Sequence, residues 1–499
     1  MKKIKSYPAD NELFIYERIR GFNEKDTEVA FPLGGIGTGN VSIGARGQFR
    51  DWEIFNRPGK GKDLPFSFFA IRCEDKKGNI VSKILESKIQ PPYNSPLGLP
   101  PHAASGIPRF EKTNFIGEYP LATINFKDPK IPLDISLEAF TPFIPLNPDD
   151  SGIPVAILKY NIKNSSSKDL IISLVGSLFN AVGYAGEEQN KHISANDQIS
   201  PFIGKNMNKK LEEATFSGIL FFSKKYNPEQ LRYGEMALGI INNENKVTYK
   251  TSWLRAENSW WIGFQDFWDD FSEDGVLEDI VYEKPTKDGM SDIGSVSTKF
   301  ELAPQENKTV VFLLSWYFPN RPYSWNQKVF DINKNEEIIK NYYASRFSGV
   351  KEVIKYVTNN YNYLEEKTLQ FYKVFFNSTL PNYILDAVSS QISVIRSTTC
   401  LWLSDGSFLG YEGCYNDHGC CEGTCTHVWN YAQTAAYLFP SLERNMRQID
   451  FLKSVKENGK MYFRTALPFG TVLKRKKRDL RPAADGQMGT IMRLYREWK

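Results

Sequence analysis

The sequence predicts a multidomain protein of mixed β and α structure, with an N-terminal antiparallel β-sandwich followed by an all-helical domain. The chain has 499 residues, more than one hydrophobic core usually supports, so we expect two or three domains. Short β-type runs follow one another from about residue 60 to about 320 without helical patterns between them. From Pro381 onward the apolar residues recur at helical spacing.

A polar lead-in over residues 1–30 precedes a glycine-rich segment at 31–57, FPLGGIGTGNVSIGARGQFRDWEIFNR. A phosphate-binding loop needs a helix directly after its glycines. Here the glycines precede a strand-like alternation of apolar and acidic residues that includes Phe49 and Asp51. The segment therefore predicts tight turns between strands rather than a nucleotide site.

The β-sandwich is predicted over residues 31–328. Its candidate strands are short runs rich in Val, Ile, Phe, Tyr and Thr, such as LDISLEAFTPF, PVAILKYNIKN, LIISLVGSLFN and KTVVFLLSWYF. Because these runs succeed one another directly, they favour an antiparallel sandwich over a doubly wound sheet. We expect long loops within it at 87–118 and 183–215.

A helical linker is predicted over residues 329–377. The segments 333–361 and 363–376 both carry apolar residues at helical spacing. We therefore expect helices here that connect the β domain with the region after it.

For residues 378–499 the sequence predicts only helices and loops. Four sets of apolar residues recur at helical spacing, and each set marks one helix face. Pro440 ends the second of these helices, and Ser441 is placed to cap the third. The fourth helix continues to Lys499 without a stop signal. The pattern predicts a chain cut off inside an all-helical domain, with apolar helix faces left exposed.

Charge and hydropathy exclude several classes of function. The net charge of +4 gives no indication of a nucleic-acid partner, and the basic run Lys474 to Arg478 is interpreted as a solvated loop. The N-terminal MKKIKSYPADNELF lacks the apolar stretch of a secretory signal. No window reaches the apolar length of a transmembrane span. We therefore predict a soluble cytoplasmic protein whose cysteines are free thiols or metal ligands.

The stretch 403–431, LSDGSFLGYEGCYNDHGCCEGTCTHVWNY, concentrates the reactive side chains of the chain. A structural zinc site is one interpretation, although the spacing departs from paired CxxC knuckles and adjacent cysteines do not easily point at one ion. A Cys425–His427 nucleophile pair is another, and buried apolar thiols that fix a loop are a third. The candidate zinc ligands are Cys414, Cys421, Cys425 and His427.

Glu412 is the candidate for carboxylate chemistry in this stretch. It stands between Tyr411 and Gly413, on a loop after a predicted helix, where a side chain can reach a cleft. A carboxylate at such a position can act as nucleophile or base in sugar chemistry. A solvated loop glutamate is the alternative interpretation.

Five collinear segments carry a family resemblance: FPLGGIGTGN at 31–40, FTPFIPLNPDDSGIPVAILKY at 140–160, WYFPNR at 316–321, YYASRF at 342–347 and CTHVWNYAQTAAYLFPSLERNMR at 425–447. Together they resemble glycoside hydrolase family 116, the family of the non-lysosomal, bile-acid-type β-glucosidase. The resemblance implies a β-sandwich, a helical linker and an (α/α)6 catalytic barrel, of which residues 378–499 would form the first helices. It also implies a carbohydrate as substrate and no cofactor.

The resemblance extends to single residues. Glu412, in DGSFLGYEG, matches the nucleophile that forms the glycosyl-enzyme intermediate of a retaining enzyme. His427 and Trp429, in HVWNY, match a sugar-contacting helix start, where relatives carry an acidic residue at the place of His427. Asp485 matches another segment near the sugar pocket, but its position before a helix favours an N-cap. Relatives have a histidine near Phe469, which this chain lacks.

Retaining hydrolysis needs a second carboxyl group about 5–5.5 Å from the nucleophile. The family's acid/base is an Asp far beyond the nucleophile, and we expect the chain to end too soon after Glu412 to contain it. The leading hypothesis is therefore the N-terminal part of a retaining β-glycosidase acting on β-glucosides, inactive by itself. The alternative is a non-catalytic carbohydrate-binding or scaffold protein, if 499 is the natural end.

Overall fold

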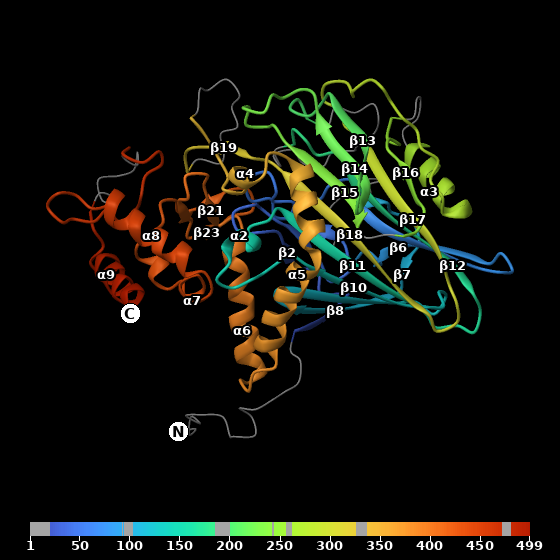
Figure 1. The fold of residues 1–499 in the computed structure, drawn as a ribbon, viewed down its shortest axis with the longest axis horizontal. Helices are drawn as coiled ribbons and strands as arrows, with labels where there is room; N and C mark the ends of the chain where they lie inside the picture. The colour runs from blue at the N-terminus through green and yellow to red at the C-terminus, as the bar shows by residue number, and fades with distance from the viewer. Residues whose placement is uncertain are drawn as a thin grey trace.

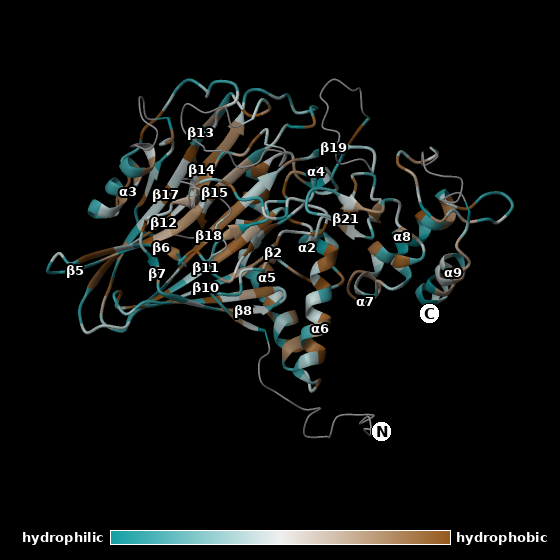
Figure 2. Ribbon diagram, turned by 180° about the vertical axis from the view of Figure 1, so that it is seen from behind, coloured by the Kyte–Doolittle hydropathy of each residue, from teal (hydrophilic) through white to brown (hydrophobic). Residues whose placement is uncertain are grey.

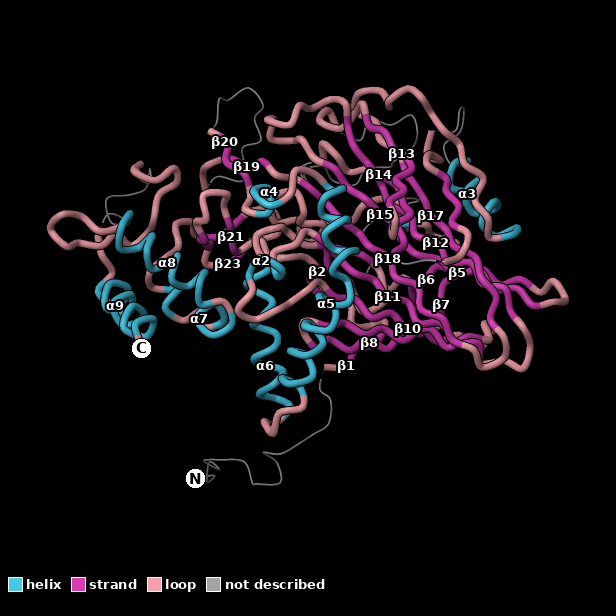
Figure 3. Tube along the Cα trace, viewed as in Figure 1, coloured by secondary structure: helices cyan, strands magenta, loops and turns pink. Residues whose placement is uncertain are grey.

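Strands and most helices occupy different parts of the molecule (Figure 3). The computed structural model describes residues 20–91, 93, 103–184, 200–241, 244–255, 262–325, 337–471 and 481–499. Within these ranges two large sheets account for most of the chain before residue 318, and helices predominate after residue 342. The protein is thus of mixed β and α type, with large antiparallel sheets followed by a few helices, as the sequence predicts at this level.

The larger sheet has nine strands, and all of its neighbouring pairs are antiparallel. Three strands of this sheet lie where the sequence predicts no strand. Strand β1 lies in the predicted lead-in, and β8 and β13 lie in the predicted long loops. In spatial order the strands are β1 (Gly21–Asn23), β8 (Lys112–Glu118), β9 (Leu121–Lys127), β10 (Leu133–Phe140), β11 (Val155–Asn164), β18 (Asn307–Tyr317), β15 (Glu235–Ile241), β14 (Phe216–Ser223) and β13 (Asn206–Glu213).

The second sheet has six strands, and among its pairs only β6 and β7 run parallel in the described chain. A helix that the sequence analysis missed, α3 (Ile262–Asp274), lies beside this sheet. Its segment IGFQDFWDDFSED is rich in Asp and Phe, which are only moderate helix formers, but Phe267 stacks on Trp253 with ring centroids 4.9 Å apart. In spatial order the strands are β16 (Val247–Lys250), β17 (Ile293–Leu302), β12 (Leu170–Phe179), β5 (Phe68–Asp75), β6 (Ile80–Ser87) and β7 (Arg109–Phe110).

The two sheets face each other across one apolar core. Phe69 of β5 meets Phe312 of β18 edge to face, with ring centroids 4.8 Å apart. The outer face of the larger sheet is buried as well, because helix α5 (Val350–Phe376) packs on it (Figure 1). A sheet covered on both faces explains the near-continuous apolar runs of β11 and β18, which Figure 2 shows as hydrophobic strands inside the molecule.

Helix α5 replaces the two helices predicted between 333 and 376. The described chain before it forms β19 (Asn320–Pro322), which pairs with β20 (Ile338–Lys340), and the single-turn helix α4 (Tyr343–Arg346); residues 333–336 lie outside the described ranges. Gly349, with an extended φ of 177°, precedes the first turn of α5. The predicted helix is therefore confirmed for α4 and from residue 350, whereas it is wrong for residues 338–340, which form β20.

The helices after α5 are shorter than it, and α6 continues directly into the 3-10 turn η2. Pro440 begins α8, so Ser441 lies inside that helix and does not cap it. The predicted exposure of apolar faces is confirmed for the last helix, where Met492 is 71% and Trp498 78% exposed. No described helix is both long and apolar enough to span a membrane. These elements are α6 (Asn382–Ile392), η2 (Ser393–Arg396), η3 (Val428–Asn430), α7 (Thr434–Leu438), α8 (Pro440–Lys453) and α9 (Ala484–Trp498).

The glycine-rich segment forms a small sheet of β2 (Phe31–Leu33), β3 (Val41–Ile43) and β4 (Phe49–Arg50), which confirms the prediction of tight turns between strands. Gly37 in the first turn has a φ of +73°, and a Cβ there would lie 2.6 Å from the Cβ of Trp402. This turn therefore needs glycine to let the segment before Glu412 approach. It joins the β part of the molecule to the candidate site.

Candidate functional site

Glu412 lies between two short β-hairpins. The first pairs β21 (Cys400–Trp402) with β22 (Phe408–Gly410), and the second pairs β23 (Gly413–Cys414) with β24 (Gly419–Cys420). The Glu412 N–H donates to the carbonyl of Cys420 at 3.1 Å. The backbone of Glu412 is thus held by strand pairing, unlike that of a solvated loop residue.

The Glu412 carboxylate is enclosed by a cation and two thiols, with 23% of its side chain exposed. Its Oε1 forms an ion pair with Arg464 Nη2. Burial by itself raises the pKa of Glu412, but hydrogen bonds from the Cys425 thiol, Arg464 and the Cys421 thiol outweigh burial, so the pKa lies below its ordinary value. Glu412 is therefore ionised at neutral pH, as a nucleophile must be.

Arg464 is the residue at this site that sequence reasoning missed. It comes from the loop after α8, and its Nη1 donates to the carbonyls of Cys421 at 3.1 Å and Glu422 at 2.7 Å. Gly423 makes room for it, because a Cβ at Gly423 would lie 2.7 Å from Arg464 Cβ. The contact with Glu412 spans 52 residues, and nothing in the local segment MYFRTALPFG marks this arginine.

His427 and Asp485, two predicted sugar-contacting residues, lie together on the surface. His427 Nδ1 contacts Asp485 Oδ2, and His427 Nε2 lies 3.1 Å from the Tyr431 hydroxyl. Hydrogen bonding to His427 lowers the pKa of Asp485. The N-cap prediction for Asp485 is wrong, because Ala483 occupies the cap and Asp485 stands in the first turn of α9, where the helix dipole favours a carboxylate.

Trp429 lies on the inner side of the site, with 6% exposure. Its Nε1 donates to the Tyr411 carbonyl at 3.1 Å, and its ring packs so closely on Gly410 that a Cβ there would lie 1.9 Å away. The side chain therefore supports the backbone on which Glu412 is placed. Contact with a sugar stays a prediction for Trp429, as it does for His427 and Asp485.

A cavity of about 650 Å³ borders this site. Glu412, Tyr411 and Trp429 line part of it, and mostly apolar side chains of α5, α6, η2, α7 and the segments between them line the rest. The volume falls within the range of roughly 300–1,000 Å³ that is usual for small-molecule sites. Among the described residues that line this cavity, Glu412 is the only carboxylate.

The thiols and imidazoles of the stretch do not form a metal site in the described residues. All six cysteines are free, and within the described part of the chain no three His, Cys, Asp or Glu side chains are placed to hold a metal ion. The zinc interpretation through Cys414, Cys421, Cys425 and His427 thus has no support in the geometry. Cys425 and His427 do not pair either, since both ring nitrogens of His427 contact other residues.

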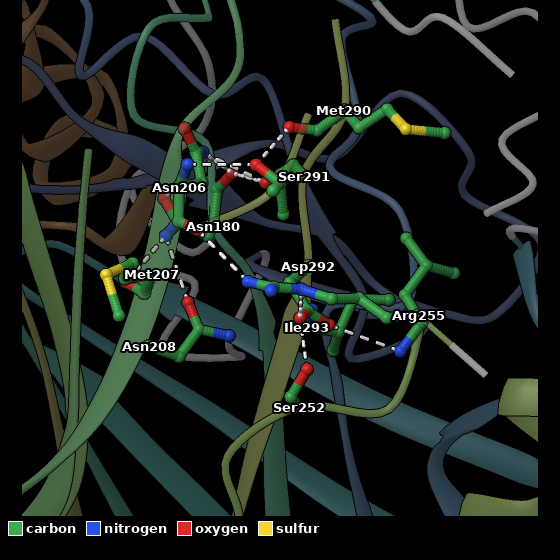
Figure 4. Close-up of polar contacts among 12 residues, drawn as sticks. Asn180, Asn206, Met207, Asn208, Ser252, Arg255, Met290, Ser291, Asp292 and Ile293 are labelled. Carbon is green, nitrogen blue, oxygen red and sulfur yellow. Dashed lines mark hydrogen bonds and ion pairs between the residues drawn. The ribbon is translucent and has the colours of Figure 1, made fainter. Parts of the chain in front are cut away.

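A second carboxylate paired with an arginine lies in the β part of the molecule (Figure 4). Asp292 contacts Arg255 and accepts a hydrogen bond from the Ser252 hydroxyl. Backbone N–H groups of Ile293 and Leu254 also donate to it, at 2.8 and 3.2 Å. Asp292 is 0% exposed, and burial raises its pKa. Substrate cannot reach this carboxylate, so the pair serves the fold.

A large part of the chain matches a known family model. Residues 30–364 match the model described as beta-glucosidase 2, glycosyl-hydrolase family 116 N-term.

Three solved structures show distant similarity to the chain. A protein from the human microbiome described as a kojibiose phosphorylase is 10% identical, with a TM-score of 0.34 and coverage of 97% of this chain and 50% of that chain. A GH92 α-mannosidase from Bacteroides thetaiotaomicron is 9% identical, with a TM-score of 0.33 and coverage of 88% and 48%. A GH36 α-galactosidase from Geobacillus stearothermophilus is 11% identical, with a TM-score of 0.22 and coverage of 50% and 30%. These TM-scores are too low to support a conclusion about the fold or the function of this chain. The chain spans about half the length of the first of these proteins.

Proposed function

Because the chain belongs to glycoside hydrolase family 116, we propose that it is the N-terminal part of a retaining β-glycosidase that hydrolyses β-glucosides, with Glu412 as the nucleophile. In this proposal residues 31–328 form a β-sandwich, 329–377 a helical linker and 378–499 the first helices of an (α/α)6 barrel. The substrate is a carbohydrate, and the protein acts in the cytoplasm.

The single observation that carries the proposal is the state of Glu412. A retaining nucleophile must be ionised, held in a fixed orientation and reachable by the anomeric carbon. Glu412 has a lowered pKa, an ion pair with Arg464 and a side chain at the edge of a cavity. These three properties favour attack on the anomeric carbon to form a glycosyl-enzyme ester.

Arg464 positions the nucleophile in this mechanism. It holds Glu412 Oε1 and, through its other terminal nitrogen, two backbone carbonyls of the same loop. The carboxylate is therefore oriented before the sugar arrives, which lowers the entropic cost of reaching the transition state. His427, Asp485 and Trp429 are proposed to contact the sugar, and no described residue is assigned as the general acid/base.

The test is covalent labelling of the full-length gene product with a 2-deoxy-2-fluoro-β-glucoside, which traps the glycosyl-enzyme ester. Peptide mapping should find the label on Glu412, and Glu412→Gln should abolish it. The matched control is Glu422→Gln, a glutamate of the same loop that should still allow labelling of Glu412. A label on any other residue contradicts the assignment, and β-glucoside binding with neither label nor turnover would favour the non-catalytic alternative.

A further inference from the structure

Two adjacent thiols meet beside the nucleophile. Cys420 Sγ and Cys421 Sγ lie 3.2 Å apart, although adjacent cysteines were not expected to point at one place. Both residues are partly exposed, so a small oxidant can reach them. Cys421 has a φ of +56°, a left-handed conformation that is unusual for a residue with a side chain. A disulfide requires about 2.05 Å between sulfurs, so the two sulfurs must move closer and close a small ring across the Cys420–Cys421 peptide.

The same dipeptide contacts the proposed nucleophile in two ways and the arginine paired with it in one. The carbonyl of Cys420 accepts the hydrogen bond of the Glu412 N–H. The Cys421 thiol donates to the Glu412 carboxylate, and the Cys421 carbonyl accepts from Arg464 at 3.1 Å. Any change in the geometry of this dipeptide is therefore transmitted to Glu412 and to its cation.

We propose that Cys420 and Cys421 are a redox modification site, a vicinal dithiol that closes to a disulfide and so changes the surroundings of Glu412. The oxidant is a peroxide. One thiolate attacks a peroxide oxygen and breaks the O–O bond, giving a sulfenic acid and, from hydrogen peroxide, water after protonation. The second thiol attacks that sulfur, the S–S bond forms, and a second water leaves with the remaining proton. The thiols lose two electrons, which the peroxide takes up.

The other cysteines are less suited to this chemistry. Cys414 contacts the Thr399 hydroxyl, with 3.4 Å between sulfur and oxygen, while Cys73, Cys400 and Cys425 are buried. The neighbouring Cys420 raises the pKa of Cys421 to about 11. The proposed reaction holds for either sulfur of the pair as the first to attack, because both orders of attack end in the same disulfide.

Site-specific mass spectrometry tests the bond without any reference to glycosidase activity. The full-length protein is treated with hydrogen peroxide, its remaining thiols are alkylated, and it is cleaved after glutamate. The peptide 413–422 should then be lighter by two hydrogens than its reduced form and should carry a single alkyl group, on Cys414. Cys414→Ser should preserve the loss, and Cys420→Ser or Cys421→Ser should abolish it. An unchanged peptide, or a cross-link to the peptide that contains Cys425, overturns the proposal.

The effect on Glu412 rests on the proposed function and is measured separately. The rate of fluoroglycoside labelling should fall at least about threefold on oxidation, because a hydrogen bond to a charged group is lost or displaced. Dithiothreitol should restore the rate, and the rate of Cys420→Ser should no longer respond to mild peroxide. A disulfide without a change in rate overturns the coupling. Absence of labelling in the reduced protein would count against the nucleophile and leave the disulfide result standing.

Discussion

Asp292 and Glu412 are both carboxylates paired with an arginine, yet their pKa values move in opposite directions. Asp292 is 0% exposed, and burial dominates its hydrogen bonds, so its pKa rises. Glu412 keeps 23% of its side chain exposed, and its hydrogen bonds and cation dominate burial. The carboxylate–arginine pair of Asp292 is closed to water and serves the fold. The pair of Glu412 is partly open to water, so its carboxylate stays charged and reachable.

Removing the buried carboxylate should have the largest effect on stability. Asp292→Ala leaves the Arg255 charge without its partner in a mostly buried position, so the free energy of unfolding should fall by about 3–5 kcal/mol. Urea unfolding followed by tryptophan fluorescence measures it. Asp266→Ala, at an exposed position on α3, is the control and should change stability by less than about 0.5 kcal/mol. A loss below about 1 kcal/mol for Asp292→Ala would break the comparison.

A smaller effect should follow from filling the space beside Arg464. Gly423 has a φ of +100°, and an added Cβ would meet Arg464 Cβ at 2.7 Å. Gly423→Ala should lower the free energy of unfolding by about 1–3 kcal/mol and slow the labelling of Glu412. Gly413→Ala is the matched control, because a Cβ added at Gly413 would have no neighbouring atom within 4 Å. Equal effects of the two substitutions would show that Arg464 does not depend on Gly423.

The smallest effect on stability, with a clear effect on pH dependence, is expected for Arg464→Gln. Arg464 is buried, but Glu412 keeps 23% of its side chain exposed to water, so the loss at neutral pH should be about 1 kcal/mol, smaller than that of Asp292→Ala. The folded pKa of Glu412 is lowered, so the pair stabilises the protein above the unfolded pKa, and this contribution disappears as pH falls through the folded pKa.

The pH dependence of labelling reports the same pair. Without Arg464 the pKa of Glu412 should rise, and the acid limb of the labelling rate should move to higher pH. Arg444→Gln, at an exposed position on α8, should leave that limb in place. An acid limb that is identical in Arg464→Gln and in the unmodified protein would show that the ion pair does not set the ionisation of Glu412.

The elements that the sequence predicted well are those whose pattern is set locally. Strand runs such as β11 and β18 and the periodicity of α5 were recognisable because burial alone dictates their residues. The strands β1, β8 and β13 were missed because their partners, rather than their own composition, make them strands. Helix α3 was missed because aromatic packing against the second sheet overrides its modest propensity.

The residues of the candidate site show the same difference between local patterns and long-range contacts. Glu412 was found through its local motif, and its role as nucleophile stays a prediction. Arg464 was not found, because its importance comes from a contact across 52 residues. The pairing of His427 with Asp485 has the same origin, since 58 residues separate them. Sequence position placed each of these two residues near the site, but only the fold brings them together.

Helix α5 covers the outer face of the larger sheet, and this determines where the protein can be cut into fragments. Val353, Ile354 and Val357 of α5 are fully buried, in one apolar cluster with Val155 and Leu313 of the sheet. A fragment cut at residue 328 would uncover that cluster and leave a wide apolar sheet face in water. A β fragment that keeps this face covered therefore has to include α5.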